Sequence, residues 1–211
     1  KLLGELKGES ALVFCNQRES VERVSNYLTE MGVDNEYFHG GMEQPERERA
    51  LSLFRNGSAS VFISTDLASR GLDIPEVKNV IHYHLPINEE AFIHRNGRTA
   101  RMNAEGNAFM ILNEIETVPE YITREPDEFF LPEKAKKPLR SEWVTLTINR
   151  GKRDKLSKKD VVGFLFQKGG LDKDDLGVVE VKESCAYAAV KRDKKEGLLA
   201  RIRDEKIKNM K

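Results

Sequence analysis

Residues 11–112 alternate short apolar runs with segments that have the period of an α-helix, and no other feature of the sequence constrains the fold as much. Residues 11–15 (ALVFC) are a continuous apolar run of strand length, and apolar residues then recur at helical spacing until Gly32, where the helix is expected to end. The same pattern predicts helices from Pro45 to Gly57 and over residues 88–95, and strands at residues 36–38, 60–64, 80–84 and 107–112. Apolar strands that alternate with helices are typical of a parallel sheet covered on both faces, so the sequence predicts an α/β domain.

The segments that directly follow these strands carry hydroxyl groups, glycines and arginines. In a parallel α/β sheet, ligands bind at the carboxyl ends of the strands, where these segments meet. Arg98 and Arg101 are expected to be neighbours on one helix face, and planar guanidinium groups match phosphate oxygens bidentately. The sequence therefore predicts an anion-binding edge, made of residues 16–18, 39–41, 65–73 and 95–101.

Four segments, in register over residues 1–115, resemble the DEAD-box RNA helicases. LVFCNQRESV, STDLASRGLDIP and HRNGRTAR are similar to motifs IV, V and VI of that family, and GGMEQPERERALSLFRNG resembles the stretch between motifs IV and V. Motif VI usually reads His-Arg-Ile-Gly-Arg-Thr-Gly-Arg, from which this chain departs at Asn96 and Ala100. The resemblance implies that the α/β domain is the second RecA-like domain of an ATP-dependent RNA helicase.

The resemblance also implies roles for single residues. Arg98 and Arg101 would reach the γ-phosphate of ATP bound across a cleft, and His94 would couple the nucleotide site to the RNA site. Arg95 would brace against acidic residues of the partner domain. The residues that would also contact the nucleotide are Gly71 and Asp73, and those that would contact the RNA backbone are Arg18, Gly40, Gly41, Gln44, Arg47 and Thr65.

Some of these residues have simpler interpretations. Asp66 could merely cap the turn after its strand, and Tyr83 and Phe92 are interpreted as core residues. His82 and His84 lie two apart on a strand and could share a metal ion, but no set of cysteines or carboxylates completes such a site. We therefore expect no metal site in this chain.

Two motifs that hold ATP and its metal ion are missing from the 211 residues, namely the phosphate loop G-x-x-x-x-G-K-[ST] and the sequence Asp-Glu-Ala-Asp. We therefore expect ATP and Mg²⁺ to be held by an N-terminal RecA-like domain that precedes Lys1. This chain alone should not hydrolyse ATP.

The helical and strand periodicity fails over residues 116–141, where four prolines favour an extended linker. Phe129, Phe130 and Leu131 are expected to fasten this linker to the first domain. From residue 142 the pattern resumes, with strands at 143–149, 176–184 and 185–193 and helices at 157–170 and from 195. The order β-α-β-β-α predicts a smaller α+β domain over residues 142–211, RRM-like but truncated before its last strand.

This second domain is basic, because residues 142–211 contain 18 Lys and Arg against 12 Asp and Glu while the whole chain has no net charge. Such an excess favours binding to phosphates. The stretches INRGKRDKLSKKDVVGFL and SCAYAAV and the KIK near the end resemble the C-terminal RNA-binding domain of DbpA-type helicases. That resemblance implies that the partner is a structured ribosomal RNA and that the role is ribosome assembly. The candidate RNA-binding residues here are Lys152, Arg153, Lys155, Lys158 and Tyr187.

The sequence is also compatible with other functions. The chain could be a non-catalytic RNA-binding protein on a helicase fold, a general RNA remodeller held by charge, or a DNA helicase of the same superfamily. No apolar run approaches the ~20 residues needed to span a bilayer, so no membrane partner is expected. Cys15 and Cys185 are interpreted as free thiols, as in a cytoplasmic protein.

Overall fold

The computed structural model describes residues 1–69, 74–99 and 106–208. Within them the chain divides into two compact units, of which the first comprises Lys1–Leu51 and Ser60–Arg140 and the second Ser52–Ala59 and the residues from Ser141 onward. Four residues singled out in the sequence lie outside the described residues: Gly71, Asp73, Ala100 and Arg101.

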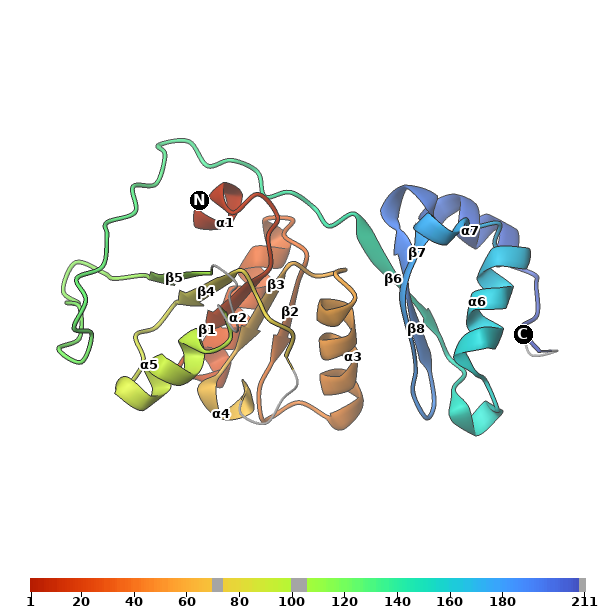
Figure 1. Cartoon of the computed structure of the whole chain (residues 1–211), viewed down its shortest axis with the longest axis horizontal. Helices are drawn as coiled ribbons and strands as arrows, with labels where there is room; N and C mark the ends of the chain where they lie inside the picture. Colours follow the sequence, from red (N-terminus) through yellow and green to blue (C-terminus); the bar gives the residue numbers. More distant parts are fainter. Residues whose placement is uncertain (70–73, 100–105, 209–211) are drawn as a thin grey trace. The chain divides into compact units, whose positions relative to one another are not determined.

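A parallel sheet forms the centre of the first unit (Figure 1). Within the described residues it has five strands in the order β2-β3-β1-β4-β5, with every neighbouring pair parallel. Because the residues of β1 are all buried and pair with strands on both sides, this central strand must be apolar throughout. The predicted α/β domain with a RecA-like sheet is confirmed. The strands are β1 (Ala11–Phe14), β2 (Asn35–Phe38), β3 (Val61–Ser64), β4 (Asn79–His82) and β5 (Asn107–Met110).

Three helices of this unit, α2, α3 and α5, follow the predicted pattern, whereas the short helices α1 and α4 were not predicted. Val21 and Val24 of α2 are buried in the core with Val13 and Ile63 of the sheet, which explains their helical spacing. α5 begins where the Asn88 side chain accepts a hydrogen bond from the Ala91 amide, and it ends at Asn96. The helices are α1 (Leu2–Glu5), α2 (Arg18–Glu30), α3 (Gln44–Arg55), α4 (Asp66–Ser69) and α5 (Glu89–Asn96).

Arg98 therefore lies beyond α5, after the Gly97 cap, and not on a helix as predicted, while its predicted neighbour Arg101 lies outside the described residues. The cause is local, since the Gly97 amide already closes the helix by donating to Ile93 and Arg95 carbonyls.

The linker after β5 has no helix or strand, as predicted, and it is fastened by Phe129, as expected, and by residues that were not expected. Phe129 packs edge-on against Phe109 at 5.3 Å between ring centroids, whereas Phe130 is 80% exposed. In an extended chain neighbouring side chains point to opposite sides, so Phe130 cannot follow Phe129 onto the domain. Tyr121, which donates to the Pro86 carbonyl, and Lys136, which pairs with Glu5 at 2.8 Å, supply further attachments.

The second unit contains an antiparallel sheet in the order β6-β8-β7, formed among residues 143–191, all of which are described. Ala186, Ala188 and Val190 alternate along β8 and pack with Val161 and Leu165 of α6. The predicted order β-α-β-β-α and the smaller α+β domain are confirmed. Its elements are β6 (Trp143–Ile148), α6 (Lys158–Gln167), β7 (Leu176–Val181), β8 (Ala186–Lys191) and α7 (Lys195–Ile202), with short 3-10 helices η1 (Lys152–Asp154), η2 (Lys173–Asp175) and η3 (Arg192–Lys194).

Among the helices of the described residues, none combines the length and the apolar composition that crossing a bilayer requires.

Candidate nucleic-acid interface

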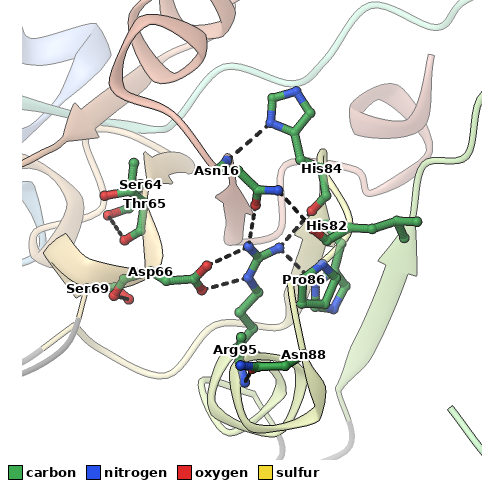
Figure 2. Close-up of polar contacts among 12 residues, drawn as sticks. Asn16, Ser64, Thr65, Asp66, Ser69, His82, His84, Pro86, Asn88 and Arg95 are labelled. Atoms are coloured by element: carbon green, nitrogen blue, oxygen red, sulfur yellow. Dashed lines mark hydrogen bonds and ion pairs between the residues drawn. The ribbon is translucent and has the colours of Figure 1, made fainter. Parts of the chain in front are cut away.

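A buried arginine joins the segments that follow three strands of the parallel sheet (Figure 2). Arg95 is 0% exposed, and its Nε and Nη2 donate to the two carboxylate oxygens of Asp66 at 2.7 and 2.6 Å. Nη2 also donates to Asn16 Oδ1 at 2.8 Å, and Nη1 donates to the His84 carbonyl at 2.7 Å. Its Cζ lies 5.0 Å from the centroid of the Phe14 ring. The guanidinium group thus holds together the segments after β1, β3 and β4.

This arrangement corrects two expectations from the sequence. Arg95 does not reach out toward a partner domain, because each of its guanidinium nitrogens bonds within the first unit. Asp66 does more than cap a turn, since both of its carboxylate oxygens bind this buried cation. A buried guanidinium needs such a bidentate partner to offset the loss of its hydration.

The two histidines of the predicted metal alternative have separate partners. His82 is fully buried, its Nε2 lies 2.9 Å from Asn96 Oδ1, and its Nδ1 lies 3.4 Å from Arg95 Nη1. Burial lowers the pKa of His82 to about 4, against the opposing effect of the Asn96 hydrogen bond. His84 Nδ1 instead accepts from the Asn16 amide at 3.1 Å. Among the described residues, no group of three or more His, Cys, Asp or Glu side chains is arranged to hold a metal ion.

Four of the predicted RNA-binding residues gather at the carboxyl ends of β1 and β2. A Cβ atom placed on Gly40 would lie 3.4 Å from Arg18 Nη2, and one on Gly41 would lie 3.5 Å from Arg18 Nη1, so the guanidinium packs on this glycine turn. Arg47 Nη2 donates to the Gly40 carbonyl at 2.7 Å, and its Cζ lies 5.7 Å from the Phe38 ring. Two guanidinium groups therefore flank a turn of two glycines. Because these glycines have no side chains, a nucleic-acid backbone could approach the turn closely.

Thr65 joins this group through a shared pocket. A pocket of about 470 Å³ is lined by Arg18, by Thr65 and Asp66 after β3, and by Asn16 and Ile87. Gln44, in the first turn of α3, is exposed and donates to Glu48 at 3.0 Å. Segments after β1, β2 and β3 thus contribute to one side of the carboxyl edge.

The described part of the predicted nucleotide site lies at the end of α5. Arg98 is 9% exposed, and its Nη2 donates to the Ser69 carbonyl at 3.1 Å and lies 2.9 Å from His94 Nε2. The structure therefore brings His94 and Arg98 together. The other three residues of this predicted site, Gly71, Asp73 and Arg101, lie outside the described residues.

In the second unit, the predicted RNA-binding cations lie between β6 and the first residue of α6. The Lys152 and Arg153 amides donate to the Lys182 and Glu183 carbonyls at 2.9 and 3.0 Å, which ties η1 to the β7–β8 turn. All four of the predicted loop cations have exposed side chains: Lys152, Arg153, Lys155 and Lys158.

Tyr187 occupies a different face of this unit. It lies on β8 opposite Thr147 and Glu180, at a position that alternates with the core residues Ala186 and Ala188. Its side chain therefore points to the face of the sheet that α6 does not cover, but it is only 6% exposed, so the ring is buried in this structure rather than presented to RNA.

Comparisons with known proteins agree with this geometry. The family model of the helicase conserved C-terminal domain matches residues 1–103, and that of the DbpA RNA binding domain matches residues 145–211. The ATP-dependent RNA helicase DbpA of Escherichia coli is 34% identical over 91% of this chain and 43% of its own length, and DbpA of Bacillus subtilis is 28% identical over 95% and 48%. This chain belongs to the DEAD-box helicases. It spans about half the length of these curated relatives. Among solved structures, the C-terminal domain of the DEAD-box protein Dbp5 is 31% identical, covers 54% of this chain and 69% of its own, and has a TM-score of 0.48.

The buried contacts of Arg95 connect three of the segments that resemble DEAD-box motifs. Asn16, Asp66 and Arg95 belong to the segments that resemble motifs IV, V and VI, respectively, and one guanidinium joins all three. Asn96, a departure from the usual motif VI, supplies the partner of the buried His82.

His39 is a site residue to which the sequence assigned no role. It is 5% exposed, its Nδ1 accepts from the Gly41 amide at 3.1 Å, and its Nε2 lies 2.9 Å from Glu22 Oε1. His39 therefore braces the glycine turn of this DEAD-box domain against α2. In the sequence, only its position directly before Gly40 indicated that His39 could support the glycine turn.

Proposed function

We propose that this chain is the C-terminal half of an ATP-dependent RNA helicase that opens or remodels short RNA duplexes, and that its RNA is structured ribosomal RNA handled during ribosome assembly. The observation that carries the proposal is that one chain joins a DEAD-box helicase domain to a DbpA RNA binding domain. The proposed domain boundaries are residues 1–115, 116–141 and 142–211, and the proposed location is the cytoplasm.

Two surfaces would bind RNA. On the first unit, the cluster of Arg18, the Gly40–Gly41 turn, Arg47 and Thr65 would contact the phosphate backbone, with Gln44 beside it. Its support is the convergence of two guanidinium groups on a glycine turn next to a pocket that Arg18 and Thr65 share. On the second unit, the exposed loop cations would bind the phosphates of a folded RNA.

ATP would be shared with an N-terminal RecA-like domain that holds Mg²⁺. Arg98 would exchange the Ser69 carbonyl for phosphate oxygens, and the same role is proposed for Arg101. His94, whose Nε2 faces Arg98, would link that movement to the RNA surface, and Gly71 and Asp73 would contact the nucleotide. Stabilising charge on the transferred phosphoryl group in this way is worth ~10³ to 10⁵ in rate. The chain alone would be inactive.

The experiment that tests the proposal is the ATPase rate of the complete protein, with its N-terminal domain, in the presence of four nucleic acids. These are a structured ribosomal RNA hairpin, an unrelated RNA duplex, single-stranded RNA and single-stranded DNA. Strong stimulation by the hairpin alone is expected. Equal stimulation by every RNA would replace the ribosomal role with general remodelling, stimulation by DNA would indicate a DNA helicase, and no stimulation would leave a binding protein.

A variant tests the role of Arg98. Arg98→Ala in the complete protein is expected to lower the ATPase rate at least ~10³-fold, while hairpin affinity stays within twofold because the second domain is untouched. Arg124→Ala, at an exposed linker position, is the matched control. Since Arg98 is nearly buried, the thermal stability of each variant is measured as well, and Arg98→Lys tests whether positive charge alone suffices. A normal rate in folded Arg98→Ala would overturn the assignment.

A further inference from the structure

A lysine near the end of the described chain holds the base of the loop that carries the exposed cations. This segment, residues 150–159, is called the basic loop here. The Lys208 Nζ donates to the Lys155 carbonyl at 2.8 Å and lies 2.9 Å from Asp160 Oδ2 in the first turn of α6. One ammonium group thus bridges the backbone of the basic loop and the helix that follows it.

The backbone at both ends of this contact is unusual. Lys155 has φ 58° and Lys208 has φ 48°. Both values lie in the left-handed region, which residues other than glycine seldom adopt. Among the described residues, the only other non-glycine residue with positive φ is Lys7, so two of three such residues meet here. A residue keeps such a conformation only where its surroundings hold it, and strained positions of this kind gather at functional sites.

The surroundings of Lys155 supply that restraint. Its own amide donates to the Lys152 carbonyl at 2.8 Å, and the next amide, of Leu156, donates to the Gly151 carbonyl at 3.0 Å. Leu156 is buried in the core of the second unit. The carbonyl of this left-handed residue is the group that Lys208 binds.

The apolar core of the second unit fixes the position of Lys208 beside the basic loop. Ile207, directly before it, is buried beside Leu156 and Val161 in the same apolar cluster. Asp160 also accepts from the Ser157 amide at 2.8 Å as part of the N-terminal cap of α6. Hydrogen bonds from Ser157 and Lys208 lower the pKa of Asp160 to about 2, so the carboxylate is charged at neutral pH.

We propose that Lys208 is a positioning residue, a clasp that holds the basic loop in the shape in which Lys152, Arg153 and Lys158 face RNA. The clasp rests on the proposed RNA binding of this loop. Because two of its three donors are directed at Lys155 and Asp160, Lys208 contributes to affinity through loop geometry rather than through a phosphate contact.

The salt dependence of RNA binding separates these two contributions. The affinity of the chain for a ribosomal RNA hairpin is measured between 50 and 200 mM salt for wild type, Lys208→Met, Lys152→Met and the control Lys206→Met, which removes an exposed lysine two positions away. Loss of a phosphate contact lowers the slope of log Kd against log salt by ~0.7 to 0.9, as expected for Lys152→Met. Lys208→Met is expected to weaken binding about fivefold or more with the wild-type slope.

Hydrogen exchange of the Asp154, Lys155 and Leu156 amides in the chain without RNA gives a second readout. These amides are expected to exchange at least about tenfold faster in Lys208→Met, and at the wild-type rate in Lys152→Met and Lys206→Met. A reduced salt slope in Lys208→Met would make Lys208 a phosphate ligand and overturn the clasp, as would unchanged exchange and affinity. If the wild-type chain does not bind the hairpin, the proposed function fails, while hydrogen exchange still decides whether the clasp exists.

Discussion

Replacing the carboxylate of Asp66 tests the central claim about the buried network. Asp66→Asn keeps the size of the side chain but removes the charge that faces a guanidinium with 0% exposure. Breaking a buried ion pair from one side costs ~3 to 5 kcal/mol, because the remaining charge is left uncompensated. Asp66 is 21% exposed, and Asn16 and the His84 carbonyl still bind Arg95 in the variant, so the lower end of that range applies.

A loss of about 3 kcal/mol corresponds to a fall of roughly 10 °C in the melting temperature of a domain of this size. Calorimetry and circular dichroism report that transition. The single tryptophan, Trp143, lies in β6, so its fluorescence reports the second unit and serves as an internal reference. Glu114→Gln makes the same chemical change at an exposed position and is expected to alter stability by less than ~0.5 kcal/mol.

The double variant Asp66→Asn with Arg95→Met completes the thermodynamic cycle. Removing both charges is expected to recover part of the stability that Asp66→Asn loses, because no buried charge is then left without its counter-ion. If Asp66→Asn melts within about 2 °C of wild type, the inference that this pair holds the three segments together is refuted.

Two further predictions concern His82 and the cysteines. Because the folded pKa of His82 (about 4) lies below its unfolded value of ~6.5, its contribution to stability is complete above pH 6.5 and is lost as the pH falls toward 4, by up to about 3 kcal/mol. Urea denaturation at pH 7 and pH 4.5 checks this, and a His82→Gln variant with the same pH dependence as wild type would contradict it. Burial raises the pKa of the Cys15 thiol to about 12, whereas Cys185 is partly exposed. A thiol reagent at pH 8 should therefore modify one cysteine in the folded chain and two in denaturant, and rapid modification of both in the folded chain would count against it.

The sheet and the neighbourhood of the site residues could be predicted from the sequence because both follow from short-range patterns. Apolar runs such as residues 11–15 need a buried strand, and the carboxyl ends of parallel strands share one edge. For this reason the sequence predicts that Arg18, the Gly40–Gly41 turn and Thr65 are neighbours.

The role of Arg95 could not be predicted in the same way. The resemblance suggested that Arg95 would meet acidic residues of another domain, whereas its partner, Asp66, lies 29 positions away in the same chain. The contact depends on the strand order β3-β1-β4, which places the segments after these strands side by side. The His39 contact with the Gly41 amide and the Lys208 contact with Lys155 likewise depend on how the chain turns, which residue types alone do not reveal.

The pairing of Asn96 with His82 bears on how this chain can be engineered. The usual motif VI has isoleucine at position 96, and transplanting that motif unchanged would leave the buried imidazole N–H without an acceptor, at a cost of ~1 to 3 kcal/mol. The usual motif VI therefore cannot replace residues 94–101 of this chain without loss of stability. A designer who restores Ile at position 96 has to replace His82 with an apolar side chain in the same step, so that the two positions are treated as a single unit of sequence.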